Sequence, residues 1–221
     1  MNLSTKQIPL SASALLAFAM LSACGGGGSA APAPAPAPAP QVTMMVSNGA
    51  GVNGTIVITL AADKAPITVK NFLAYVNAGF YNGTVIHRVV PNFVVQGGGY
   101  AGPVDASTAP AAIKATNAPI KLEAGVGLSN TQWTIAMART SVADSATSQF
   151  FINLVDNSAI LDANATSAPP KPGYAVFGSV SAGTDIVAAA VAAPCTATQL
   201  VGPGECTPIP NVVVTSAVQS R

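Results

Sequence analysis

Short runs in which hydrophobic and polar residues alternate predict a chain built mainly of β-strands. These runs recur from Val42 onward, and turn-forming residues separate them. Successive side chains of a strand point to opposite faces, so each run can bury one face. Asn53-Gly54 predicts the turn between the first two strands. The expected strands are 43–47, 55–60, 84–90, 93–96, 134–138, 149–153, 174–180 and 211–217.

A helical pattern replaces this alternation in two segments. Pro66 suits the first turn of a helix, apolar residues follow at 69, 72, 73 and 76, and Gly79 ends it. A second, short helix is expected over 183–190. The segment 100–130 has few periodic apolar positions and predicts a long surface loop. About eight strands with turn signals between neighbours indicate a β-barrel or a β-sandwich.

The segment 84–99 contains an arginine in an apolar setting. Alternation places Arg88 on one face with Ile86 and Val90, and His87 on the opposite face. A guanidinium over an apolar surface needs hydrogen-bond acceptors, because its desolvation otherwise costs free energy. The alternative is an amphipathic strand with one solvated arginine. The three glycines at 97–99 predict a tight turn, because no phosphate-binding fingerprint surrounds them.

Residues 1–23 have the pattern of an export signal. Lys6 supplies the positive charge, and the apolar stretch 8–21 is too short to span a bilayer. The sequence Leu-Ser-Ala-Cys at 21–24 resembles the lipobox of bacterial lipoproteins, in which the cysteine, here Cys24, carries the lipid. An ordinary secretory signal with an incidental cysteine is the alternative. By resemblance to that class, glycine rather than aspartate at 25 favours the outer membrane.

A linker is expected over 24–41. Glycines and a serine come first, and Ala-Pro repeats continue to Pro40. The repeats predict an extended polyproline II stalk of roughly 35 Å, which would hold a domain away from a membrane. The alternative is a proline-rich ligand for a partner domain. The single folded domain is then expected over 42–221.

Composition excludes several kinds of site. The chain has 221 residues, Lys+Arg 9, Asp+Glu 8 and a net charge of +1, without the clustered basic residues of a nucleic-acid interface. His87 is the single histidine and the three cysteines are far apart, so neither a metal site nor a cofactor is expected. After Cys24, an even pair remains, Cys195 and Cys206. In an exported protein this pair favours a disulfide, with two free thiols as the alternative.

Several segments, in this order, resemble cyclophilin-type peptidyl-prolyl cis-trans isomerases of the bacterial periplasmic branch. The resemblance covers about 45–218, and the run Ser-Gln-Phe-Phe-Ile-Asn at 148–153 is its most specific part. It implies a mainly β fold, a closed eight-stranded antiparallel barrel capped by two α-helices. The matching segments are 54–58, 65–72, 79–81, 86–89, 93–98, 134–139, 145–153 and 173–178.

The resemblance also implies roles for individual residues. Arg88 matches the family's catalytic arginine. The residues expected to contact substrate are Phe93, Val94, Gln96, Met137, Ala138, Arg139, Gln149, Phe151, Ile160, Leu161 and Tyr174. Ile86, Val94 and Ile160 depart from the residues usual in the family. These departures bear on pocket shape and substrate preference rather than on the type of reaction.

The expected function is isomerisation of Xaa-Pro bonds during the folding of exported proteins. Partners would be proline-containing polypeptides and, through Cys24, the outer membrane, with a monomeric domain facing the periplasm. A peptide-binding or chaperone lipoprotein with little turnover is the main alternative, and an adhesion or structural lipoprotein is another. A serine hydrolase would have to use His87, but no nucleophile-elbow motif is present. His87 is therefore expected to be a hydrogen-bonded structural residue.

Overall fold

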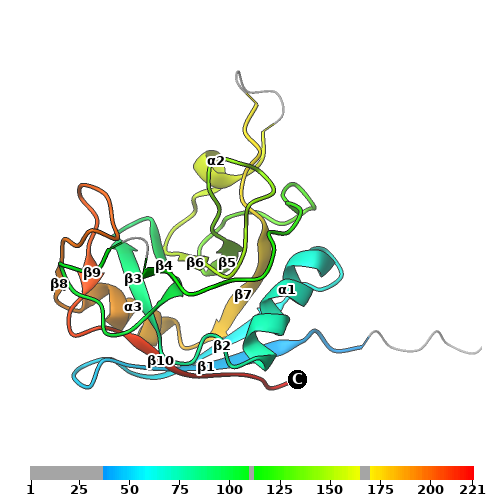
Figure 1. Cartoon of the computed structure of the whole chain (residues 1–221). Coiled ribbons are helices and arrows are strands. Elements are labelled where there is room, and N and C mark those ends of the chain that lie inside the picture. The colour runs from blue at the N-terminus through cyan, green and yellow to red at the C-terminus, as the bar shows by residue number, and fades with distance from the viewer. Residues whose placement is uncertain (1–36, 110–111, 165–169) are drawn as a thin grey trace, which may run out of the picture. The chain divides into compact units, whose positions relative to one another are not determined.

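Eight strands close into an antiparallel β-barrel in the computed structural model, which describes residues 37–109, 112–164 and 170–221 (Figure 1). The closed barrel is confirmed, and the sandwich that the pattern left open is excluded. Closure removes the exposed edges that an open sheet would present to other chains. Around the barrel, the strands are β1 (Gln41–Ser47), β10 (Val213–Gln219), β3 (Thr84–Val90), β4 (Val94–Ala101), β6 (Phe150–Asn153), β5 (Thr134–Met137), β7 (Val176–Ala182) and β2 (Asn53–Leu60).

The two predicted helices are present. α1 (Pro66–Asn77) packs against β10, and α3 (Thr184–Ala192) packs against β2, on opposite sides of the barrel in Figure 1. The carboxylate of Glu123 accepts hydrogen bonds from the backbone N–H groups of Ile67 and Thr68 at 3.1 and 2.8 Å, and so caps the start of α1. A third helix, α2 (Ser158–Leu161), was not predicted, because a single turn is too short to show helical periodicity.

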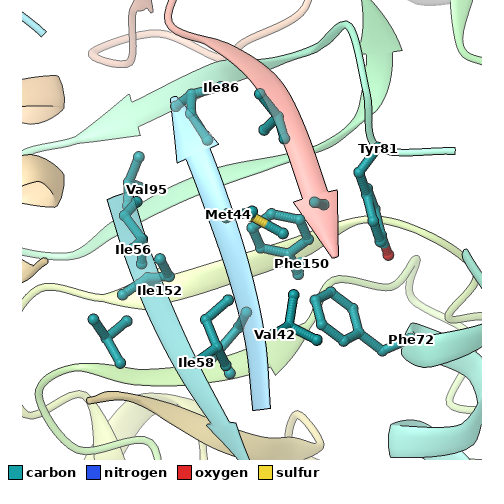
Figure 2. Packing of buried hydrophobic residues seen from close by; sticks show 14 of the residues in the cluster. Val42, Met44, Ile56, Ile58, Phe72, Tyr81, Ile86, Val95, Phe150 and Ile152 are labelled. Carbon is teal, nitrogen blue, oxygen red and sulfur yellow. The ribbon is translucent and has the colours of Figure 1, made fainter. Parts of the chain in front are cut away.

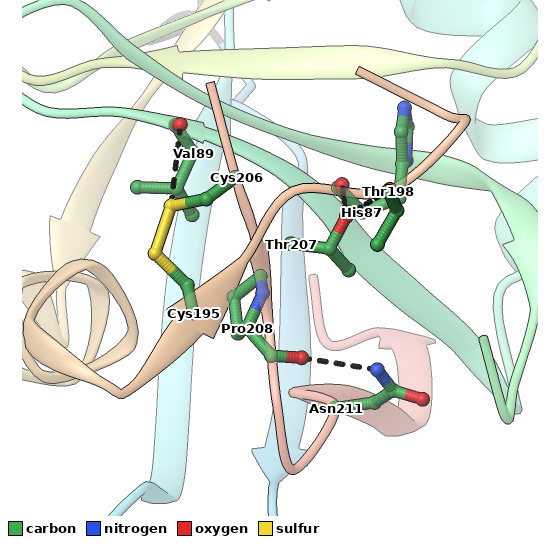
Figure 3. The surroundings of a disulfide bond; sticks show 8 residues. All are labelled: His87, Val89, Cys195, Thr198, Cys206, Thr207, Pro208 and Asn211. Carbon is green, nitrogen blue, oxygen red and sulfur yellow. Dashed lines mark hydrogen bonds between the residues drawn. A yellow bond between two sulfur atoms is a disulfide. The ribbon is translucent and has the colours of Figure 1, made fainter. Parts of the chain in front are cut away.

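Two small strands lie outside the barrel. β8 (Cys195–Thr196) and β9 (Thr207–Pro208) pair antiparallel beside β3. A disulfide joins Cys195 to Cys206 and closes the loop between these strands (Figure 3). The pattern did not predict these strands, because two residues cannot show alternation.

The predicted signal peptide (1–23), Cys24 and most of the linker (24–41) lie outside the described residues. Gln41, at the end of that linker, already belongs to β1. In the described ranges, no helix has both the length and the hydropathy that a membrane span requires. The loop was predicted over 100–130, but Tyr100 and Ala101 belong to β4. From 102 to 130 the described residues form neither an α-helix nor a barrel strand, as expected.

The main core contains apolar side chains from the barrel strands and from α1 (Figure 2). The ring of Phe72, on α1, lies 5.0 Å from that of Phe177 and 5.3 Å from that of Tyr81. Tyr81 is fully buried, and its hydroxyl donates a 2.8 Å hydrogen bond to the carbonyl of Ser148. Burial of such rings contributes about 2–3 kcal/mol each, so this cluster fixes α1 against the sheet.

A β-bulge in β3 changes the predicted faces of that strand. From Ile86 to Arg88 the paired residue on β4 moves by only one position, from Gly97 to Gln96. Ile86 and Val89 therefore both enter the main core, and Arg88 does not share a face with Ile86 as alternation predicted. The bulge directs Arg88 to a pocket outside this core.

The glycines at 97–99 do not form the predicted tight turn, because they belong to β4. Gly98 has φ +81°, and a Cβ there would lie 2.9 Å from the ring of Tyr81 and 3.0 Å from that of Phe150. Glycine is required at this position by the close approach of two rings and by the backbone conformation. The turn predicted at Asn53-Gly54 is also displaced: those residues begin β2, and Asn48 opens the turn.

Candidate active site

Three adjacent strands place an arginine, an amide and a phenyl ring in one row. Arg88 of β3 pairs with Gln96 of β4, and Gln96 pairs with Phe151 of β6. Residues paired directly across strands project to the same face, so these side chains are neighbours although the sequence separates them. They line a pocket of about 250 Å³.

Most of the residues predicted to contact substrate meet at this pocket. Its walls are formed by Arg88, Phe93, Val94, Gln96, Ala138, Arg139, Phe151, Leu161 and Tyr174. Gln149 instead lines an adjoining pocket of about 200 Å³, which shares Gln96, Ala138 and Arg139 with the first. The two pockets together form a continuous surface on which an extended peptide could lie.

Two predicted contact residues do not line either pocket. Met137 is 1% exposed and belongs to the main core, because the alternation along β5 turns its side chain inward. Ile160 is 62% exposed, because the short turn of α2 directs Leu161 into the pocket and its neighbour into solvent. The family resemblance named these two residues but did not predict the direction in which their side chains point.

The arginine is held by acceptors on two sides. Its Nη1 donates to Oε1 of Gln96 at 3.1 Å, and Nε2 of Gln96 donates to Oε1 of Gln149 at 2.8 Å. Its Nε donates to Oε2 of Glu205 at 2.7 Å, and its Nη2 donates to Oε1 of the same residue at 2.5 Å. The side chain is 22% exposed, which excludes the alternative of a solvated arginine on an amphipathic strand.

The opposite wall of the pocket is apolar. Val94, Phe151 and Leu161 belong to a small hydrophobic cluster, and Phe93 and Tyr174 pack against it. The ring of Phe151 meets that of Tyr174 edge-on at 5.6 Å. The pocket therefore combines this apolar wall with the hydrogen-bonded cation of Arg88.

A network of buried amides, which the sequence did not predict, positions that wall. Nδ2 of Asn157 donates to Oδ1 of Asn153 at 2.9 Å and to the carbonyl of Phe93 at 2.8 Å. The carboxylate of Asp162 accepts from the backbone N–H and the side-chain amide of Asn130, both at 2.8 Å. Because Asp162 directly follows α2, this contact fixes the end of the helix that carries Leu161. Asn153 ends β6 and belongs to the matched run 148–153, but it was given no role. Asn130, Asn157 and Asp162 were missed because they lie outside the strands, where short polar side chains usually face solvent.

The second arginine of the pocket, Arg139, is held by backbone carbonyls and by an aromatic ring. Nε of Arg139 donates to the carbonyl of Gly173 at 2.9 Å, and Nη1 donates to the carbonyl of Thr140 at 2.8 Å. Its guanidinium carbon lies 4.4 Å from the ring centre of Tyr174. The hydrogen bond to Gly173 and the cation–π contact with Tyr174 hold this part of the pocket wall in place.

His87 is next to Arg88 but does not reach the pocket. It is 2% exposed and meets the ring of Tyr100 edge-on at 4.8 Å. Burial, with a further contribution from the charge of Arg88, lowers the pKa of His87 to about 4, so the imidazole is neutral at pH 7. Its burial fits the expected structural role, but the expected hydrogen bonding is not found at Nδ1, which has no partner among the described residues.

The arrangement can bind and polarise a peptide without forming a covalent bond to it. No group of three or more His, Cys, Asp or Glu residues in the described ranges is placed to hold a metal ion. The pocket combines an apolar wall with a positioned N–H donor, which suits a substrate with a small apolar ring beside an amide.

Comparison with known proteins identifies the family. Residues 42–218 match the family model described as cyclophilin type peptidyl-prolyl cis-trans isomerase/CLD. A peptidyl-prolyl cis-trans isomerase of Acinetobacter baylyi is 55% identical over 134 residues, which cover 61% of this chain and 65%, less than two thirds, of that protein. Peptidyl-prolyl cis-trans isomerase A of Dickeya dadantii is 48% identical over 164 residues, 74% of this chain and 78% of that protein.

A solved structure shares the fold. The crystal structure of a cyclophilin type peptidyl-prolyl cis-trans isomerase of Cryptosporidium parvum, in the presence of the dipeptide Ala-Pro, has a TM-score of 0.60 and 19% sequence identity. The match covers 82% of this chain and 99% of that chain. With the family model matching most of the sequence and the barrel closed as in that structure, the chain belongs to the cyclophilin-type peptidyl-prolyl cis-trans isomerases.

Proposed function

We propose that the chain accelerates cis–trans isomerisation of Xaa-Pro bonds in exported proteins, with Arg88 as the catalytic residue. The observation that carries this is the fixed guanidinium of Arg88 facing a wall formed by Phe93, Phe151 and Leu161. The pocket of about 250 Å³ has room for a pyrrolidine ring, and Arg88 supplies N–H donors to the same pocket.

The chemistry requires binding rather than bond making. Rotation about an amide meets a barrier of about 18–20 kcal/mol, because the C–N bond has partial double-bond character. As the bond twists, the proline nitrogen becomes pyramidal and gains a lone pair. An N–H of Arg88 can donate to that lone pair and so stabilise the twisted state more than either planar isomer. Gln96 keeps the guanidinium in this position.

The test is exchange spectroscopy by NMR on a short Xaa-Pro peptide, with peptide affinity measured in the same samples. We expect catalysis by the full chain, and a loss on the order of 2–4 kcal/mol of transition-state stabilisation in Arg88→Ala. Arg88→Lys should recover part of the loss, because an ammonium does not reproduce the planar fork. Phe151→Ala should weaken binding as well as turnover. A wild type that binds peptide without catalysis would favour the binding-module alternative.

We further propose that the protein acts outside the cytoplasm from a lipid anchor on Cys24. The lipobox-like sequence at 21–24 and the Ala-Pro stalk support this, and so does the disulfide, since disulfides persist in oxidising compartments. Metabolic labelling with a fatty acid should mark the wild type and not Cys24→Ser. Label that persists in Cys24→Ser would exclude the anchor.

A further inference from the structure

A carboxylate from a distant part of the sequence meets the pocket arginine. Glu205 lies 117 residues from Arg88, and its two oxygens accept from Nε and Nη2 of the guanidinium at 2.7 and 2.5 Å. Both side chains are 22% exposed. Two parallel hydrogen bonds of this geometry fix the guanidinium plane. The exposed Lys64–Asp63 contact, with 4.0 Å between nitrogen and oxygen, is too long for a hydrogen bond and fixes neither side chain.

The position of Glu205 is fixed by the segment that carries it. The next residue, Cys206, exchanges two backbone hydrogen bonds with Val89, at 2.8 and 3.2 Å, directly beside Arg88. The disulfide to Cys195 closes the same segment, as Figure 3 shows next to β3. Oε2 of Glu205 also accepts from the backbone N–H of Gly202 at 2.9 Å. The carboxylate is therefore constrained on three sides before any substrate binds.

The contacts leave a defined part of the guanidinium for substrate. A guanidinium carries five N–H donors. Glu205 takes two of them and Gln96 takes one, which leaves one on Nη1 and one on Nη2 without a partner in the described structure. The carboxylate of Glu205 and the amide of Gln96 bind different edges of the guanidinium. The two remaining N–H donors therefore cannot rotate away from the pocket.

We propose that Glu205, held in the disulfide-closed segment 195–206, is a positioning residue that fixes Arg88 for isomerisation. This inference rests on the proposed function. Without Glu205, the arginine would have to lose side-chain entropy on reaching the twisted amide, and turnover would fall. Arg88 holds the pKa of Glu205 below its usual range, so the pair persists at neutral pH.

The opposite role is that of an inhibitory latch. A carboxylate that occupies Arg88 could instead compete with substrate for it. The two roles differ in sign, because removal of a latch speeds catalysis and removal of a positioning residue slows it. The orientation of the pair favours positioning. Glu205 accepts from the N–H of Nε and from one N–H of Nη2, while one N–H on Nη1 and one on Nη2 have no partner in the described structure.

The experiment compares Glu205→Gln with a matched control in the full chain. The chain has only two glutamates, and the other, Glu123, caps α1 and does not line the pocket. We expect Glu205→Gln to lower the bound-state isomerisation rate about tenfold, the scale on which supporting contacts affect functional groups. Peptide affinity should change less than about twofold. Glu123→Gln should lower thermal stability and leave the rate unchanged.

A double mutant separates positioning from general damage. If Glu205 acts through Arg88, Glu205→Gln should cause no further loss in an Arg88→Ala background. Replacing both Cys195 and Cys206 with serine should lower the rate in the wild type and not in Glu205→Gln. Unchanged or faster turnover in Glu205→Gln, or an equal loss in both backgrounds, would overturn the inference.

One readout is independent of catalysis. The Nε–H of Arg88 should give a resolved ¹H–¹⁵N signal with slow solvent exchange in the wild type, and that protection should disappear in Glu205→Gln. Equal protection in both proteins would overturn the inference. An inactive wild type with a protected Nε–H would instead overturn the proposed function and leave the fixed guanidinium established.

Discussion

The buried histidine makes the free energy of unfolding depend on pH in a defined window. His87 is the only histidine in the chain, and its pKa is about 4 in the folded protein against a usual 6.5. The unfolded chain therefore binds a proton below pH 6.5 that the folded chain does not bind until about pH 4. The stabilisation is fully present above pH 6.5 and is lost as the pH falls from 6.5 towards 4.

The magnitude follows from the two pKa values. The full difference corresponds to about 3 kcal/mol, of which about 2 kcal/mol should be lost between pH 7 and pH 5. Glu205 also has a lowered pKa, but protonation of the unfolded carboxyl begins mainly below its usual 4.5. The window from pH 7 to pH 5 therefore reports chiefly on His87.

Urea unfolding followed by the fluorescence of Trp133, the single tryptophan, measures this loss. His87→Gln keeps a polar group of similar size that does not titrate, so its stability should be nearly constant between pH 7 and pH 5. In the wild type, the NMR signals of the only imidazole should remain those of the neutral form down to about pH 5. Equal pH dependence in both proteins, or an imidazole that titrates near 6.5, would refute the reasoning.

Three substitutions test the packing around the site. Phe72→Ala removes a fully buried ring from the contact of α1 with the barrel and should cost about 3–5 kcal/mol in urea unfolding. Gly98→Ala should cost about 2 kcal/mol or more, since the new methyl would meet Tyr81 at 2.9 Å with φ at +81°; an unchanged midpoint would contradict this. Ile160→Ala, at a 62% exposed position, should change stability by less than about 0.5 kcal/mol. Its turnover of a short peptide should match the wild type, and a large loss would show that the residue contacts substrate.

The sequence by itself determined the eight barrel strands, the two longer helices and most of the residues that line the pocket. Alternation located the barrel strands, and the spacing from Val69 to Val76 located α1, because local patterns report which face of an element is buried. The family resemblance named Arg88, Gln96 and Phe151, which the structure places in one row. It also named Met137 and Ile160, which lie elsewhere.

Tertiary structure decided the orientations and the long-range partners. A bulge in β3 places Arg88 and Ile86 on different faces. Strict alternation cannot predict a bulge, because one extra residue moves every later side chain to the opposite face. The glycines at 97–99 predicted a turn, yet they continue β4. Glycine is needed there because a Cβ at any of the three positions would lie 2.8 or 2.9 Å from a neighbouring side chain.

The partner of the arginine was the least predictable feature. Glu205 follows a glycine in a proline-containing loop, where a charged residue usually faces solvent, and its contact with Arg88 spans 117 residues. The sequence indicated that a buried guanidinium needs acceptors, because desolvation without them is costly. Only the closed barrel, with the disulfide-linked segment packed beside β3, decided that one of those acceptors is Glu205.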